Sequence, residues 1–81
     1  MAIPRLSAEQ RRALAMLATS GRDGATRSFL VAHGFGVPMI NALVNQGLAT
    51  LTYEKVLFAG KLVDVAKVRI TDAGQDALGE N

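Results

Sequence analysis

The sequence predicts an α+β fold in which three helices come first, a two-stranded β-hairpin follows, and a short helix closes the chain. Two observations support this prediction. The first half of the chain has apolar residues at helical spacing between short glycine-containing breaks, whereas residues 48–70 are rich in β-branched residues and partly alternate. Because 81 residues can form only one small core, we expect a single domain over residues 1–81.

The first helix is predicted within "LSAEQRRALAMLA". Ser7 and Gln10 have the spacing at which two side chains can cap each other's free backbone N–H groups, so the helix is expected to start there. The apolar residues that follow form one stripe, expected to face the core: Ala13, Leu14, Leu17 and Ala18.

The next segment reads as helix, tight turn, helix. The loop "TSGRDGA" ends the first helix, and a short second helix is expected over roughly Ala25 to His33. Gly34 and Gly36 suit a tight turn, and Pro38 fits the first turn of a third helix.

The third helix, within "VPMINALVNQG", has two different faces. At 100° per residue one side gathers Val37, Ile40, Leu43 and Val44, and the opposite side gathers Pro38, Ala42, Asn45 and Gln46. Gly47 is expected to end it.

The segments "LATLTYEKVLF" and "KLVDVAKVRI" are predicted to form a hairpin with Ala59-Gly60 as its loop. That loop places four pairs on one mostly apolar face, namely Leu51 with Val68, Tyr53 with Ala66, Lys55 with Asp64, and Leu57 with Leu62. The reverse face pairs Thr50 with Arg69 and Thr52 with Lys67, with Glu54 diagonal to Lys67.

A last short helix is expected within "ITDAGQDAL", with Thr71 as its N-cap and Asp72 in its first turn, where a negative charge suits the helix dipole. Three helices, a hairpin and a closing helix in this order describe a winged helix, in which the hairpin is the wing.

Part of the chain resembles the DNA-binding core of MarR-type transcriptional regulators. "LVNQGLA", a hairpin and then "ITDAGQDAL" look like the family's path from reading helix through wing to a Thr-x-x-Gly helix start. The similarity covers about Ser28 to Leu78, and Ile70 to Gly74 is its most specific element. It implies the winged-helix fold, while the family's long flanking dimerisation helices have no counterpart here, so function does not follow from it.

Composition limits the function classes. The formal net charge is +2 and the pI is near 9.5, which permits a polyanionic partner without requiring one. There is no Cys, which excludes disulfides and thiolate metal sites, and no apolar run of membrane-spanning length or signal-peptide type. We therefore expect a cytoplasmic location and no contact with a membrane.

The sequence best fits a small DNA-binding or transcription-associated protein. No Lys, Arg, Asp or Glu lies between Arg27 and Glu54, so the third helix itself offers no charged contact to phosphate. Asn41 and Asn45, with Gln46 as a third option, are candidates for contacts to adenine, and Pro38 and Ala42 would allow close approach. Phosphate contacts would come from basic residues on other elements, namely Arg5, Arg11, Arg12, Arg22, Arg27, Lys55, Lys61, Lys67 and Arg69.

The alternative is a protein-interaction or dimerisation module on the same scaffold. It would use the uncharged third helix and the apolar hairpin end, with these candidate interface residues: Met39, Val56, Leu57, Phe58, Leu62 and Val63. A second copy, another protein, or the chain's own first helix could cover that end.

Catalysis is not expected. The only His, His33, stands at a predicted helix end, where it reads as a capping or half-buried side chain, and the acidic residues are scattered. Gly34 and Gly36 match no phosphate loop. No cofactor, metal or small-molecule substrate is predicted.

Overall fold

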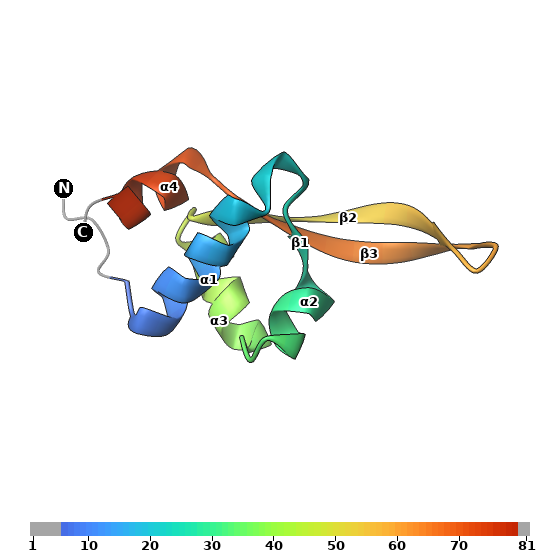
Figure 1. The fold of residues 1–81 in the computed structure, drawn as a ribbon, viewed down its shortest axis with the longest axis horizontal. Coiled ribbons are helices and arrows are strands. Elements are labelled where there is room, and N and C mark those ends of the chain that lie inside the picture. Colours follow the sequence, from blue (N-terminus) through green and yellow to red (C-terminus); the bar gives the residue numbers. More distant parts are fainter. Residues whose placement is uncertain (1–5, 80–81) are drawn as a thin grey trace.

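The computed structural model describes residues 6–79 and has the α+β winged-helix arrangement (Figure 1). Helices form the body of the molecule, and the hairpin extends from it as a long arm. The elements in chain order are α1 (Ala8–Thr19), the 3₁₀ turn η1 (Gly21–Asp23), β1 (Ala25–Thr26), α2 (Arg27–Ala32), α3 (Val37–Asn45), β2 (Ala49–Phe58), β3 (Lys61–Ile70) and α4 (Asp72–Gly79).

The start of α1 is confirmed as a reciprocal cap. The Gln10 backbone N–H donates to Ser7 Oγ, and the Ser7 backbone N–H donates to Gln10 Oε1, both at 3.0 Å. Three of the four predicted stripe residues are fully buried, but Ala18 is exposed, so the core-facing stripe of α1 is narrower than predicted. The hydrophobic core contains side chains from all three N-terminal helices and from β3. Its largest fully buried members are Leu14, Leu17, Leu30, Ile40, Leu43 and Val68.

The second helix begins later than predicted. Thr26 Oγ1 accepts the Phe29 backbone N–H at 3.0 Å, which makes Thr26 the N-cap of α2 and Arg27 its first residue. Ala25 and Thr26 instead form β1, which pairs antiparallel with Val68 and Lys67 of β3. The sheet therefore has three strands in the order β1-β3-β2, rather than the two of the predicted hairpin.

The turn between α2 and α3 is tight, as predicted. Gly34 has a φ of +92°, which an L residue rarely adopts, and the Phe35 backbone N–H reaches back to the Leu30 carbonyl at 3.0 Å. Phe35 is buried under this turn. Pro38 lies in the first turn of α3, so the helix-turn-helix unit is formed as the sequence indicates.

The predicted hairpin register is confirmed. Leu51 pairs with Val68, Tyr53 with Ala66, Lys55 with Asp64 and Leu57 with Leu62, and ten consecutive pairs join β2 to β3. The loop residues Ala59 and Gly60 have φ values of +50° and +79°, the signature of a two-residue type I′ turn. The hairpin gives the molecule its length, with extents of 47 × 22 × 21 Å.

The end of α3 is fixed against the start of α4. Thr71 Oγ1 donates to the Gly47 carbonyl at 2.6 Å and accepts the Gly74 backbone N–H at 3.0 Å, while the Thr71 backbone N–H donates to the Leu48 carbonyl at 3.1 Å. The predicted N-cap at Thr71 is confirmed, and α4 is thereby held beside the chain that leaves α3.

Candidate nucleic-acid interface

The side of α3 that faces away from the core is polar and uncharged. Ile40 and Leu43 are fully buried and anchor the helix, whereas Pro38, Asn41, Asn45 and Gln46 are exposed and Ala42 is half-buried. The apolar side is less uniform than predicted, because Val37 at the helix start is exposed. This face of α3 is therefore available to a partner, as are the exposed α2 side chains of Phe29 and Val31.

The amide side chains of this face are free. Within residues 6–79 the side chains of Asn41, Asn45 and Gln46 make no hydrogen bond. An amide presents one acceptor and two donor hydrogens, which match the N6 and N7 edge of adenine in a bidentate contact. The arrangement can therefore read a base edge without disrupting an internal bond.

Two of the predicted phosphate-binding residues are engaged within the hairpin. Lys55 Nζ lies 2.8 Å from Asp64 Oδ1. The Arg69 guanidinium donates to the Arg22 carbonyl at 2.9 Å, to Thr52 Oγ1 at 3.0 Å and to Glu54 Oε2. Arg69 thus joins the hairpin to η1, and its charge is matched by that of Glu54.

The partner of Glu54 differs from the prediction. The sequence places Glu54 diagonal to Lys67, but the structure pairs it with Arg69, which is one further position along the same face of β3. The Arg69 side chain is long enough to pass Thr52 and reach the carboxylate. Lys67 is left without an ion pair within residues 6–79.

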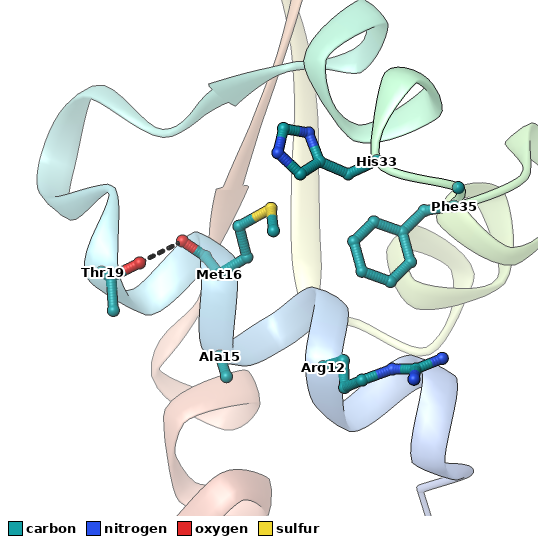
Figure 2. A pocket seen from close by; sticks show the side chains of 7 residues that line it. Arg12, Ala15, Met16, Thr19, His33 and Phe35 are labelled. Atoms are coloured by element: carbon teal, nitrogen blue, oxygen red, sulfur yellow. Dashed lines mark hydrogen bonds between the residues drawn. The ribbon is translucent and has the colours of Figure 1, made fainter.

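Arg12 lies beside the helix-turn-helix turn (Figure 2). It lines a hollow of about 590 Å³ between α1 and the α2–α3 turn, together with Ala15, Met16, Thr19, His33, Gly34 and Phe35. Arg11 does not line this hollow, because one residue along a helix turns the side chain by about 100°. The two arginines predicted to act together therefore project from different sides of α1.

A second basic position lies where the wing leaves the body. Lys67 is the register partner of Thr26, and Arg27 follows directly as the first residue of α2. Lys67 also lines a shallow hollow with Thr26 and Phe29. Lys61 lies instead at the far end of the hairpin, next to the loop. Arg5 lies outside the described residues.

The predicted interface residues fall into two groups. Met39 is half-buried and packs against the core. The others lie at the end of the hairpin and are exposed, namely Val56, Leu57, Phe58, Leu62 and Val63. The structure therefore separates Met39 from the apolar end of the wing.

His33 occupies a structural position. It is the C-cap of α2, and its Nδ1 lies 2.9 Å from the Phe29 carbonyl oxygen. Its ring contacts the Phe29 ring in a tilted arrangement, with centroids 4.2 Å apart and an angle of 41° between the planes. This agrees with the capping role expected from the sequence.

Sequence reasoning missed the Arg69 network and β1. Thr52, Glu54 and Arg69 lie on one face of the hairpin. This signal predicts the network once the length of an arginine side chain is considered. Across residues 6–79, no group of three His, Asp or Glu side chains could hold a metal ion, and no helix is long and apolar enough to cross a membrane.

Comparison of the chain with protein families, characterised proteins and solved structures finds no match. The winged-helix class therefore depends on the geometry described above.

Proposed function

We propose that this protein binds double-stranded DNA, with the exposed face of α3 in the major groove. The supporting observation is the set of free amides of Asn41, Asn45 and Gln46 on an uncharged helix that follows a tight helix-turn-helix turn. An α-helix fits the major groove, and amide side chains recognise adenine there. The small Pro38 and Ala42 on the same side leave room for close approach.

Affinity would come from basic residues on elements other than α3. Arg12 beside the α2–α3 turn and Arg27 and Lys67 at the wing junction have no ion-pair partner within residues 6–79. Each phosphate that such a residue neutralises releases counterions, so binding weakens as salt rises. With about three such contacts, we expect modest affinity and a shallow salt dependence.

The test is a titration of the ¹⁵N-labelled protein with an A·T-rich duplex and a G·C-rich duplex, each at low and moderate salt. We expect shifts on α3, the α2–α3 turn and the wing junction that shrink as salt rises, with larger shifts for the A·T-rich duplex. The Asn45→Ala variant is expected to discriminate less between the two duplexes, because one of the three amides is removed. Ser28→Ala, an exposed polar position on α2, serves as the control. An unchanged spectrum at low salt would remove the proposal.

A further inference from the structure

The end of the hairpin is apolar on both of its faces. We call Val56, Leu57, Phe58, Leu62 and Val63 the wing cap. Leu57 and Leu62 are register partners on one face and are 69% and 67% exposed. Val56 and Val63 are partners on the other face, where they are 40% and 39% exposed and where Phe58 is 71% exposed. Figure 1 shows that this end projects far from the helices, so nothing in the described chain covers it.

The β2 strand is an unprotected sheet edge. It has β3 on one side and no strand on the other. Proteins commonly guard such edges with charges, proline or bulges. Here the register is unbroken over ten pairs, β2 contains no proline, and both of its charges are matched, Glu54 by Arg69 and Lys55 by Asp64.

We propose that the chain forms a homodimer in which the β2 edges of two copies pair antiparallel at the wing caps. A two-fold axis perpendicular to the sheet keeps each face on its own side. Centred on Leu57, it sets Leu57 beside Leu57 of the partner subunit and Val56 beside Phe58 of the partner subunit. In this register apolar residues meet on both faces, and Glu54 and Lys55 do not meet their own copies.

Edge pairing fits the wing cap better than stacking of two hairpins. Each face of the cap exposes only two or three apolar side chains, too few to reach the ~800 Å² per partner of a typical specific interface. Stacking would cover one face and leave the other in water. Edge pairing brings together side chains of both faces and satisfies outward-facing backbone groups as well.

The free edge of β3 is the less suitable partner. Its outer side is covered by β1 at Val68 and Lys67 but not at the cap. Lys61, at the start of this edge, has no ion pair within residues 6–79, and two β3 edges paired about Leu62 would set it beside the apolar Val63 of the partner subunit. The charges on β2 are neutralised within each copy.

Matched substitutions on the two strands test the geometry. Sedimentation equilibrium over a wide concentration range gives the dimer dissociation constant. We expect Leu57→Lys and Val56→Lys on β2 each to raise it about tenfold, the effect of a lost interface contact of ordinary strength. Leu62→Lys and Val63→Lys, their register partners with nearly equal exposure, are expected to change it less than about threefold. All four sites are exposed, so circular dichroism should show each variant folded.

Backbone protection supplies a second readout. The amide proton of Leu57 lies on the outer side of β2, because the two-residue loop makes Phe58 and Val56 hydrogen-bonded partners of β3. It should exchange more slowly at high than at low protein concentration, while the amide protons of β1 should not. Equal effects of Leu57→Lys and Leu62→Lys would overturn edge pairing in favour of stacking. A stronger effect of the β3 variants would overturn it in favour of the other edge.

A protein that remains monomeric over the whole concentration range would overturn the proposed homodimer. A monomer that instead binds vesicles of anionic phospholipid through Phe58 would overturn it as well. The proposal does not rest on DNA binding, and either can fail alone.

Discussion

Gly74 of α4 lies directly against the backbone of Leu48. The approach is so close that a β-carbon on Gly74 would overlap the Leu48 carbonyl oxygen and crowd the Ile70 side chain. The hydroxyl and backbone N–H of Thr71 bind the carbonyls of Gly47 and Leu48 next to it. The Thr-x-x-Gly pattern therefore has a physical reason. Thr71 caps α4 and ties it to the exit of α3, and Gly74 permits the approach.

Replacing Gly74 by Ala is expected to destabilise the fold. Ala is the better helix former by up to about 1 kcal/mol, but the added methyl must displace backbone, and overpacking of this kind costs about 1–3 kcal/mol. We expect a net loss of about 1–2 kcal/mol in the free energy of unfolding, measured in urea. Gly79→Ala in the same helix meets no atom within 4 Å and should be neutral or slightly stabilising. Equal stability of the two variants would contradict the close approach.

The Thr71 hydroxyl is expected to contribute about 1–2 kcal/mol to the free energy of unfolding. It makes two hydrogen bonds, one as the N-cap of α4 and one as a donor to the carbonyl of Gly47 at the end of α3. Thr71→Val keeps the shape and removes both bonds, so the urea midpoint should fall. Thr71→Ser keeps the hydroxyl and should retain most of the stability. If Ser destabilises as much as Val, the methyl group and not the hydroxyl is responsible.

The two ion pairs of the hairpin should contribute different amounts to the free energy of unfolding. The Arg69–Glu54 pair is half-buried, with side-chain exposures of 30% and 38%, and Arg69 makes two further bonds, whereas Lys55 and Asp64 are 67% and 62% exposed. We expect Glu54→Gln to lower the unfolding free energy by about 1 kcal/mol, and Asp64→Asn by less than about 0.5 kcal/mol. Added salt should weaken the exposed Lys55–Asp64 pair proportionately more than the half-buried Arg69–Glu54 pair, so the ranking should persist at high salt. A larger effect of Asp64→Asn in thermal or urea unfolding would refute this ranking.

The hairpin loop carries a residue in an unfavourable conformation. Ala59 has a φ of +50°, where an L residue other than Asn, Asp or Gly loses roughly 1 kcal/mol. Ala59→Asn creates the Asn-Gly pair that type I′ turns favour and should raise stability by about 0.5–1 kcal/mol. Ala66→Asn, at a half-buried strand position on β3, should lower it instead. A lower melting temperature for Ala59→Asn would show that the turn is not type I′ in solution.

The parts of the fold that were predicted depend on local rules. A two-residue loop at Ala59-Gly60 determines which side chains share a face, so the whole register followed from it. The Ser7 and Gln10 cap and the Thr71 cap also depend on residues within one helical turn.

The features that were missed depend on tertiary contact. A strand as short as Ala25–Thr26 has no periodicity to detect, and it exists because β3 lies beside it. The pairing of Arg69 with Glu54 depends on how far a long side chain reaches, which spacing alone does not show. For the candidate site, the amides of α3 were correctly placed on its exposed face, but Lys55 and Arg69, named as candidates for phosphate contacts, are both ion-paired in the structure.

The basic residues of the hairpin differ in whether they already have an ion-pair partner, and this difference provides a test of the proposed DNA contact. Lys67 and Lys55 lie on the two strands of one hairpin, yet only Lys55 has a carboxylate partner, Asp64, within residues 6–79. A lysine that contacts phosphate contributes about one unit to the slope of log K against log salt concentration. We expect Lys67→Ala to lower that slope by about 1 in fluorescence anisotropy titrations with a duplex, because Lys67 lies near Arg27 at the wing junction. Lys55→Ala should leave the slope nearly unchanged, since its charge is already matched. Equal losses for both variants would mean that Lys55 exchanges Asp64 for phosphate on binding, and no loss for either would place the DNA contact away from the wing.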